Sequence, residues 1–580
     1  MNQIVLIIIA IFLAAAGVAV VFVVLKWLVL KPIAAMTDYI KSILAGKTGP
    51  QINLPNFNFF RPLAEQISRM SKSLAQARFV ASEEARLRLE KIDTPWTAER
   101  LKEFIKAYLK NRKIFVVSNR EPFVHKKING KIQYVVPASG AVTALEPVME
   151  ACGGLWLAYG SGDADKLTVD GQDKIQVPPD EPKYTLKRVW LTEEEIKGYY
   201  TGFSNEALWP LCHMAHNRPI FRKEDWQEYR RVNGKFAQSL LAEIKGITSP
   251  IILVQDFHFA LLPQMIKKSR PDAQVSLFWH IPWPSAESFS ICPWRKEIVE
   301  GILGADVVGF HTQLHCNNFM DTAKKEIESL VDPEQFSVTH EKHATYIKPF
   351  PISIAFSDGH DPAPEPQKTD RLLEKFGVKT KSIGLGVDRL VYIKGIPERF
   401  TGIEFFFDQH PDYIGKFTFL QIAPPSREGV EKYRQYNKEV TDLALRINEK
   451  FATADWHPIV LIKESLSHED LNLLYGRAAV CLVTSLHDGM NLVAKEFAAS
   501  RNDEAGVLVL SQFTGAARDL KGAISINPYS AEQTAAAIFE ALTMPPTEQR
   551  RRMLKMREAV KSYNVYRWSA ELIKATASTG

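Results

Sequence analysis

Short apolar runs alternate with amphipathic helical stretches along the chain from Lys113 onward. Each run is apolar at nearly every position, which is typical of strands in parallel sheets that helices cover on both faces. The runs occupy residues 114–117, 251–254, 275–279, 307–310, 383–387, 417–422, 459–462, 480–484 and 507–510. They are too numerous for one sheet of ordinary size. We therefore predict an α/β fold with two Rossmann-like, doubly wound domains that face each other across a cleft.

A proline-rich stretch between Pro349 and Pro366 separates these runs into two groups. It predicts a first Rossmann-like domain over residues 113–356 and a second over residues 357–545. The last segment, residues 546–580, is predicted to form helices that pack back across both domains. A helical linker is predicted over residues 81–112, with helical patterns at 82–91 and 98–111.

The N-terminal segment has a different pattern. No charged residue lies between Ile4 and Leu25, a stretch long enough for a helix to cross roughly 30 Å of hydrocarbon. Lys26 and Lys31 follow at once, so the positive-inside rule predicts that the rest of the chain is cytoplasmic. A cleaved signal peptide is the alternative, but its apolar region would be shorter and would follow a positive charge. We predict that residues 1–30 are a retained single-pass anchor in the cytoplasmic membrane.

Two short heptad patterns follow the predicted anchor. Their apolar residues recur every three or four positions, which predicts helices that pair with a parallel partner. The two seams are Ile33, Met36, Ile40 and Ile43, then Leu63, Ile67, Met70 and Leu74. This helix–connector–helix pattern over residues 31–80 resembles a HAMP module. The resemblance implies a homodimer or larger assembly, whereas a plain amphipathic spacer is the alternative.

Composition narrows the class of protein only slightly. Apolar residues make up 46% of the 580-residue chain and charged residues 24%, which is ordinary for a globular protein with a buried core. The net charge of +6 comes without a dense Lys/Arg stripe, so it does not indicate a nucleic-acid partner. The five cysteines form no CxxC pair, which favours reduced thiols over disulfides or a zinc site.

Charged and aromatic residues follow the apolar runs of the first half, where ligands bind in doubly wound sheets. Arg120 follows the first run, and its planar guanidinium matches the oxygens of a phosphate. The polar span after it predicts a loop that folds over the strand end. Gly140 then opens a helical stretch whose amides could face a phosphate, although a structural turn glycine is the alternative.

Asp256 and His258 follow the second run of this half, and His280 follows the third. Prolines and aromatic residues surround them. Carboxylates accept hydrogen bonds from sugar hydroxyls and aromatic faces pack on sugar C–H surfaces, so this group predicts a sugar site. For each histidine alone, a buried structural role is an equal alternative.

The second half carries positive charge at one strand end and a carboxylate at another. Arg389 and Lys394 follow the run at 383–387, and two such charges can stabilise a departing diphosphate without a metal. Asp488 follows the run at 480–484, just before a helix whose first amides can face a phosphate. Glu496 lies farther along that helix, where a carboxylate can bind both ribose hydroxyls. Without an acidic DxD cluster, we expect no metal and no cofactor besides a nucleotide-sugar co-substrate.

In this order, the sequence from Lys113 to Leu572 resembles the trehalose-6-phosphate synthase family of retaining GT-B glycosyltransferases. The matching stretches are SNR, CGGLW, FSNEALWP, DWQEYRRVNGKFA, VQDFHFALLP, HIPWPSAESF, PWRKEIVEGILGADVVGFHT, KGIPERF, QIAPPSR, DGMNLVAKEF and GVLVLSQFTGAA. The resemblance implies transfer of glucose from UDP-glucose to glucose 6-phosphate, giving trehalose 6-phosphate. It also implies that residues 113–356 bind the acceptor and residues 357–545 bind the nucleotide sugar.

The resemblance further implies a role for individual residues. The acceptor-binding residues would be Arg120, Tyr200, Trp209, Asp256 and Arg427. The donor-binding residues would be Gly140, Arg389, Lys394, Asp488, Gly489, Met490, Asn491, Leu492 and Glu496. The residues at the reaction itself would be Asp256, His280, Arg389 and Lys394. The acceptor would attack from the face that the diphosphate leaves, and the leaving oxygen would take the acceptor proton.

Some positions depart from the family pattern. Tyr159 stands where the family usually has tryptophan, Val391 where it has aspartate, and His487 where it has arginine. The loop that begins REPF and contains NGK is similar to that of glucosylglycerol-phosphate synthases, which implies glycerol 3-phosphate as an alternative acceptor. A HAMP-linked sensor that binds sugar nucleotide without turnover is a further alternative, although all the roles that turnover needs are filled.

Overall fold

The computed structural model describes residues 13, 16–44, 60, 62–64, 66–67, 70, 95–109, 112–137, 140–356, 366–426 and 429–579. The chain divides into two units, Met1–Asp93 and Thr94–Gly580, which are treated separately. The predicted helix at 82–91 and the predicted acceptor residue Arg427 lie outside the described residues.

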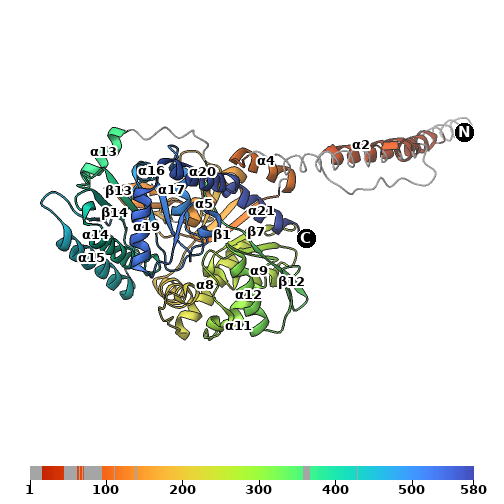
Figure 1. Ribbon diagram of the computed structural model, residues 1–580. Helices are drawn as coiled ribbons and strands as arrows, with labels where there is room; N and C mark the ends of the chain where they lie inside the picture. The colour runs from red at the N-terminus through yellow and green to blue at the C-terminus, as the bar shows by residue number, and fades with distance from the viewer. Residues whose placement is uncertain are drawn as a thin grey trace, which may run out of the picture. The chain divides into compact units, whose positions relative to one another are not determined.

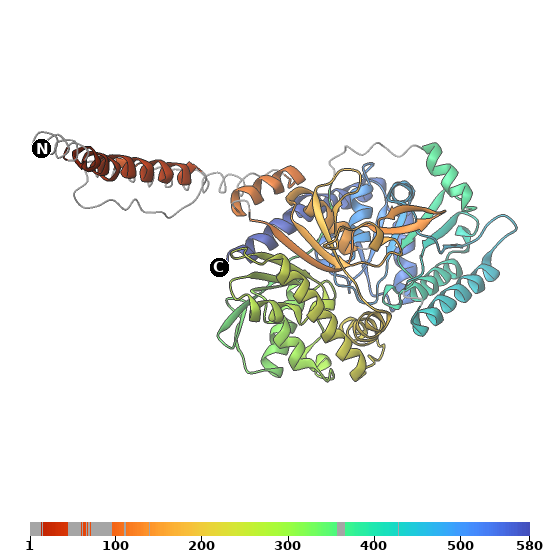
Figure 2. The same cartoon turned by 180° about the vertical axis from the view of Figure 1, so that it is seen from behind.

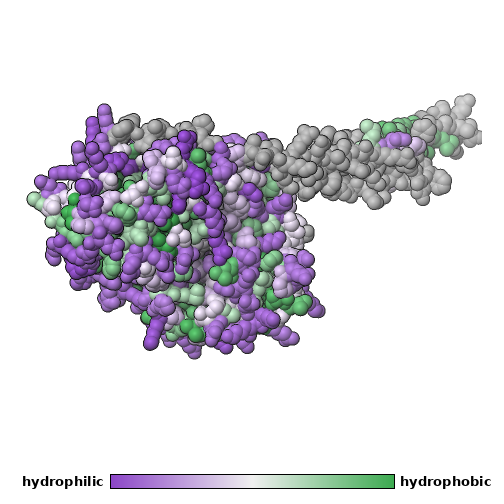
Figure 3. Space-filling view, in the orientation of Figure 1, coloured by the Kyte–Doolittle hydropathy of each residue, from purple (hydrophilic) through white to green (hydrophobic). Residues whose placement is uncertain are grey.

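The first unit contains one long apolar helix, Ala16–Asp38. It includes the π-helical segment η1 (Lys26–Leu30) and runs into α2 (Lys31–Leu44). Only 6% of its most apolar window is buried, and Figure 3 shows apolar side chains on the surface of this unit. Its length and composition suffice to cross a membrane, but an N-terminal signal sequence has the same properties. The retained anchor therefore stays a prediction.

The predicted heptad seams are only partly buried within this unit. Met36 and Ala64 are buried, whereas Ile33, Leu63 and Met70 are exposed. Leu74 lies outside the described residues, so the HAMP-like module also stays a prediction.

The second unit, the body, contains a ten-stranded sheet within its described residues. The sheet order is β10 (Leu330–Asp332), β11 (Ser337–His340), β12 (His343–Pro349), β9 (Val307–Phe310), β8 (Gln274–Phe278), β7 (Ile251–Gln255), β1 (Ile114–Arg120), β4 (Leu155–Tyr159), β6 (Tyr184–Val189) and β5 (Lys174–Val177). The pairs from β12 to β6 are parallel, and the pairs at both edges are antiparallel. The chain order reverses between β1 and β7.

The body's second sheet is parallel throughout. Its order is β15 (Ile459–Ile462), β14 (Phe417–Ile422), β13 (Ser382–Val387), β16 (Val480–Val483), β17 (Val507–Ser511) and β18 (Ile524–Ile526). Here the chain order reverses between β13 and β16. Two doubly wound sheets, as predicted from the apolar runs, are thereby confirmed.

Helices cover both faces of these sheets. Those of the first half are α4 (Ala98–Leu109), α5 (Gly140–Cys152), η2 (Asp165–Leu167), α6 (Glu193–Glu195), η3 (Ile196–Leu208), α7 (Trp209–His213), α8 (Lys223–Glu243), η4 (Phe257–Phe259), α9 (Leu262–Ser269), α10 (Ala286–Phe289), α11 (Arg295–Ile302) and α12 (Gln313–Glu326). Those of the second half are α13 (Pro366–Lys375), η5 (Tyr392–Lys394), α14 (Ile396–Gln409), η6 (Pro411–Tyr413), α15 (Glu431–Phe451), α16 (His468–Arg477), α17 (Leu492–Ser500), α18 (Ala516–Asp519), α19 (Ala531–Thr543), α20 (Pro546–Ser562) and α21 (Val565–Ala577). Figures 1 and 2 show α11 and α12 well apart from α14 and α15.

The predicted loop after Arg120 is wrong, because this segment forms a β-hairpin. Strand β2 (Val124–Ile128) pairs antiparallel with β3 (Lys131–Val135). Asn129 and Gly130 join them with φ of 50° and 75°, the two positive values that a two-residue hairpin turn needs. The Asn-Gly pair was the signal that the polar composition concealed.

The C-terminal helices contact both halves of the body. Helix α20 packs against α17 and α18, whereas α21 packs against α4, α5 and the strands β7, β8 and β9. Figure 1 shows α21 beside α4, which comes from the other end of the body's sequence. The side chain of Asn564 donates to the Trp96 carbonyl at 2.7 Å. At the start of α21, the Val565 N–H donates to the Ile354 carbonyl at 3.0 Å, so the two segments that join the halves are bonded to each other.

Candidate active site

Both sheets bring functional side chains to the point where their strand order reverses. In doubly wound sheets, the loops diverge there and leave a crevice for ligands. Arg120 ends β1 and Asp256 follows its neighbour β7. Arg389 follows β13, and Asp488 follows its neighbour β16. The two halves therefore place an arginine and an aspartate at equivalent positions.

One pocket joins the two halves. Arg120, Tyr200, Trp209 and Asp256 line it from the first half, and Arg389 lines it from the second. Its other lining residues are Ser118, Asn119, Val142, Leu145, Trp156, Gln255, Phe257 and His258. The structure thus brings four predicted acceptor residues together with an arginine that was assigned to the donor diphosphate.

Asp256 is held in an unusual backbone conformation. Its φ of 76° and ψ of 167° lie in a region that is essentially reserved for glycine and costs about 1–3 kcal/mol. Its carboxylate Oδ1 accepts from the N–H of Phe257 at 2.9 Å and from the N–H of His280 at 3.2 Å. The strand end therefore fixes the direction of this carboxylate before any substrate arrives.

Aromatic rings and Arg120 form the adjoining wall of the pocket. Arg120 is exposed, and its Nη2 donates to the Tyr200 hydroxyl at 3.4 Å. The Tyr200 ring stacks on His258, with centroids 5.8 Å apart and an 11° angle between the planes. Trp209 is buried beside them. A cation next to hydroxyl and ring groups suits a phosphorylated sugar.

On the donor side, Lys394 and Asp488 are bonded to each other. The Lys394 Nζ donates to Asp488 Oδ2 at 2.6 Å, and the Asn491 Nδ2 donates to the same oxygen at 3.2 Å. Burial favours the neutral carboxyl, but the ammonium and amide groups outweigh it and lower the pKa of Asp488 to about 2. The carboxylate is therefore ionised, and its charge is already balanced.

The loop after Asp488 touches the first half of the body. A Cβ on Gly489 would lie 2.5 Å from the His280 carbonyl oxygen, so only glycine fits this approach. Asn491, with φ of 84°, accepts from the Ala494 N–H at 3.1 Å and caps α17, which begins at Leu492. Met490 is buried between them.

His280 lies between this loop and Asp256. Its Nε2 donates to the Gln255 side-chain oxygen at 2.9 Å. Burial lowers the pKa of His280 to about 3, so the imidazole is neutral near pH 7. It can therefore offer a hydrogen bond to a sugar but no charge.

Glu496 lies on α17 and Gly140 begins α5, and neither lines the pocket itself. The Glu496 Oε2 accepts from the Tyr475 hydroxyl at 3.0 Å, and burial raises the pKa of this carboxyl. Gly140 begins α5, whose residues Val142 and Leu145 line the pocket. No sequence pattern indicated Tyr475, because it lies on α16 and contacts Glu496 only in the folded chain.

The positive charge of the crevice comes from protein side chains. Within the part of the chain that the structure describes, no group of three or more His, Cys, Asp or Glu side chains could hold a metal ion. Arg120 and Arg389 line the pocket. Lys394, which follows Arg389 closely in the sequence, forms an ion pair with Asp488. These cations can oppose the charge that develops on a departing phosphate.

The sequence matches known proteins over most of the body. A family model described as glycosyltransferase family 20 matches residues 112–578. The UDP-forming α,α-trehalose-phosphate synthase of Pichia angusta is 34% identical over 475 residues, which cover 80% of this chain and 98% of that protein. The 56 kDa subunit of the Saccharomyces cerevisiae enzyme is 34% identical over 477 residues, which cover 80% of this chain and 94% of the relative.

Solved structures share the fold. An E. coli structure described as trehalose-6-phosphate bound with UDP-2-fluoro glucose has a TM-score of 0.70 and 30% identity, and the match covers 80% of this chain and 99% of that one. A UDP-forming α,α-trehalose-phosphate synthase from Burkholderia xenovorans, in complex with glucose-6-phosphate, has a TM-score of 0.71 and 29% identity, with 80% and 100% covered.

Proposed function

The chain belongs to glycosyltransferase family 20, and on that premise we propose that it is a UDP-forming α,α-trehalose-phosphate synthase with a GT-B fold. It transfers glucose from UDP-glucose to glucose 6-phosphate and yields trehalose 6-phosphate and UDP. The observation that carries this function is the pocket in which Arg120 and Asp256 of one half meet Arg389 of the other.

The acceptor residues divide the work along this pocket. Arg120 binds the acceptor phosphate with Tyr200 and Trp209, and the resemblance adds Arg427 to this group. Asp256 accepts from the acceptor hydroxyls beside the reacting oxygen. Because Asp256 is fixed by two backbone N–H groups, it orients the acceptor without moving.

The donor residues hold the nucleotide sugar in the facing half. Arg389 and Lys394 bind the diphosphate together with the backbone at Gly140, and Glu496 binds the ribose. Asp488 and His280 bind the glucose hydroxyls, with the backbone from Gly489 to Leu492 around them. Lys394 is bonded to Asp488 in the unliganded protein, so donor binding exchanges this ion pair for contacts with diphosphate and sugar.

The reaction then needs positioning and charge rather than a protein nucleophile. The C1–oxygen bond to the diphosphate breaks while a C1–oxygen bond to the acceptor forms on the same face. The acceptor proton passes to the leaving phosphate oxygen, and UDP departs. Arg389 and Lys394 stabilise its charge, and we propose that no metal takes part.

The test offers purified protein UDP-glucose with either glucose 6-phosphate or glycerol 3-phosphate and identifies the product by mass. We expect trehalose 6-phosphate, formed at the same rate with and without EDTA. The REPF and NGK stretches make glycerol 3-phosphate the alternative acceptor. Product formed from glycerol 3-phosphate alone would show that it, and not glucose 6-phosphate, is the acceptor. UDP-glucose binding without any product would indicate the sensor instead.

We further propose that the helix Ala16–Asp38 tethers the enzyme to the cytoplasmic membrane as a single-pass anchor. The family match begins at residue 112 and leaves this helix outside it. The HAMP-like residues after it would join two chains. The full chain should stay in the membrane fraction after alkaline carbonate and leave it with detergent. A chain found in the soluble fraction, cleaved near residue 25, would show a signal peptide.

A further inference from the structure

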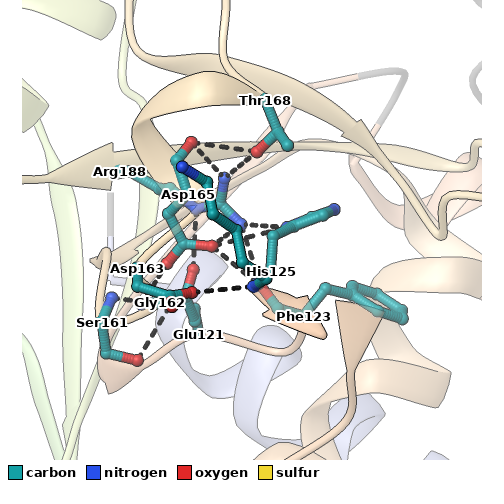
Figure 4. A network of polar contacts seen from close by, with 10 residues as sticks. Glu121, Phe123, His125, Ser161, Gly162, Asp163, Asp165, Thr168 and Arg188 are labelled. Carbon is teal, nitrogen blue, oxygen red and sulfur yellow. Dashed lines mark hydrogen bonds and ion pairs between the residues drawn. The ribbon is translucent and has the colours of Figure 1, made fainter. Parts of the chain in front are cut away.

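Arg120 is followed directly by a buried carboxyl group. The Glu121 side chain is 1% exposed, and its Oε2 accepts from the Arg188 Nε at 2.7 Å. Its Oε1 accepts from the N–H and the hydroxyl of Ser161, at 2.8 and 3.0 Å. Figure 4 shows that these groups come from separate elements and converge on the Arg188 guanidinium.

A second buried carboxylate binds the same guanidinium. Asp165 Oδ1 lies 2.9 Å from the Arg188 Nη2 and also accepts from the His125 N–H at 2.7 Å. Its Oδ2 accepts from the Gly162 N–H at 2.6 Å. We call Glu121, Asp165 and Arg188 the acceptor-side cluster. It ties the end of β1 to the hairpin, to the loop after β4 and to β6.

The cluster contains one carboxyl group more than its cation can balance. The other titratable groups near the cluster are Tyr159, which faces Glu121 and Asp165, and His125, which faces Asp165 and Arg188. His125 Nδ1 faces the Arg188 Nη2 at 2.8 Å and must accept there, so the imidazole is neutral. Burial together with Asp165 raises the pKa of Glu121 to about 8, which favours the protonated carboxyl near pH 7.

The cluster borders the acceptor end of the active site. Glu121, Tyr159 and Ser161 line a cavity of ≈ 240 Å³ that shares Arg120 and Tyr200 with the pocket described above. A buried, fully bonded network of this kind holds its backbone segments rigidly. The cluster holds Arg120 most directly, because Arg120 immediately precedes Glu121 in the chain.

The second half has the same arrangement around its own arginine. Asp388 immediately precedes Arg389, and its Oδ2 accepts from the buried Arg399 Nη1 at 2.7 Å. The remaining donors of Arg399 reach the neutral side chains of Gln421, at 2.6 Å, and Thr484, at 2.9 Å. This donor-side pair provides a matched comparison within one molecule.

We propose that Glu121, Asp165 and Arg188 are positioning residues that hold Arg120 in register with the acceptor phosphate, as Asp388 and Arg399 hold Arg389 for the donor. The proposal rests on the function assigned above and goes beyond it, because that function assigns none of these five residues a contact with a substrate. Its distinctive consequence is selectivity: disturbing one cluster changes the handling of one substrate.

The test compares Glu121→Ala, Glu121→Gln and Asp388→Ala in the full chain. We expect Glu121→Ala to raise the KM for glucose 6-phosphate about 10-fold or more, because a misplaced binding group loses its contact. Its affinity for UDP, measured by calorimetry, should stay within about 2-fold of wild type. Glu121→Gln keeps the shape and most of the hydrogen bonds, so it should restore the acceptor KM.

Asp388→Ala should show the reverse pattern, with weaker UDP binding or a lower kcat and a nearly constant acceptor KM. UDP binding by the Glu121 variants also shows that they are folded. Equal losses for both substrates in Glu121→Ala, or an unchanged acceptor KM, would overturn the proposal. If the wild-type chain shows no turnover, the proposed function is wrong instead. The positioning role is then tested by measuring the affinity of the variants for glucose 6-phosphate by calorimetry.

Discussion

In both halves of the body, an arginine at a strand end adjoins a buried carboxyl group that a second, buried arginine holds. On the donor side, Arg399 faces one carboxylate, Asp388, together with neutral partners. On the acceptor side, Arg188 faces two carboxyl groups. The donor side is balanced in charge, whereas the acceptor side has one carboxyl group more than its buried cation balances.

The residues predicted to bind the substrates also differ between the two halves in how they are bonded. On the donor side, Lys394 and Asp488 form an ion pair. On the acceptor side, Arg120 donates to the neutral Tyr200 hydroxyl and Asp256 is fixed by backbone N–H groups. The predicted donor residues are thus bonded to each other, whereas the predicted acceptor residues are bonded to neutral groups.

The largest expected effect is that of Arg389→Ala. The substitution removes a cation from the leaving diphosphate, so kcat should fall about 10²- to 10³-fold. Arg120→Ala should instead raise the KM for the acceptor with a smaller change in kcat. Steady-state kinetics with each substrate varied separates the two results. An unchanged rate in Arg389→Ala would remove Arg389 from the reaction.

Lys394→Met probes the ion pair on the donor side. The pKa of Asp488 is lowered to about 2, so its contribution to stability is present above about pH 4 and is lost as the pH falls to 2. That contribution is about 2 kcal/mol. Without the ammonium, burial raises the pKa of the carboxyl, so the pH dependence of this contribution should reverse and stability should be lost as the pH rises.

Urea unfolding between pH 3 and 7 measures this shift. Lys450→Met is the control, because Lys450 pairs with Glu404 and Asp408 on the surface and should matter little. If both variants unfold with the same pH dependence, the Lys394 pair does not stabilise Asp488.

Each half also has a candidate site residue that is not glycine but has a positive φ: Asp256 in the first half and Asn491 in the second. A glycine should relieve the backbone strain that any Cβ carries there, whereas alanine should not. At each position the glycine variant should be about 1–2 kcal/mol more stable than the alanine variant. Thermal melts compare the pairs, and both Asp256 variants should be inactive. Equal melting temperatures within a pair would show that the conformation is not strained.

A further expected effect is a change of slope in the pH profile of stability for Glu121→Gln. The pKa of Glu121 is raised from 4.5 to about 8, so wild type should lose stability as the pH rises through this range. One group contributes at most about 1.4 kcal/mol per pH unit. Glutamine carries no proton to lose, so its variant should show a flatter stability profile between pH 5 and 8. Parallel profiles would place the bound proton elsewhere.

The central strands were predictable because each is buried on both faces and therefore apolar at every position, as in β7 and β14. Other strands were not predicted: β4 was missed although it lies inside the sheet, whereas the edge strand β15 was predicted. Strand β6 alternates buried and half-buried residues and β3 is exposed throughout, so neither carries an apolar run. The hairpin was missed although its Asn-Gly turn was visible in the sequence.

The site was predictable as far as it follows the strand ends. Arg120, Asp256 and Arg389 each come just after an apolar run, and they line one pocket. The residues that support them are distant in sequence: Arg188 lies on β6, next to the edge strand β5, and Arg399 lies on α14. Their partners are set by the topology, which the local pattern of a single sequence does not contain.

The bond between the Val565 N–H and the Ile354 carbonyl has a mechanical consequence. The chain leaves the first half beside the place where it returns, so both crossings between the halves lie at one place in the body. Any rotation of the donor half relative to the acceptor half must therefore bend both crossings together. A label at Thr579 reports on the acceptor half, although it sits at the end of the donor half's sequence.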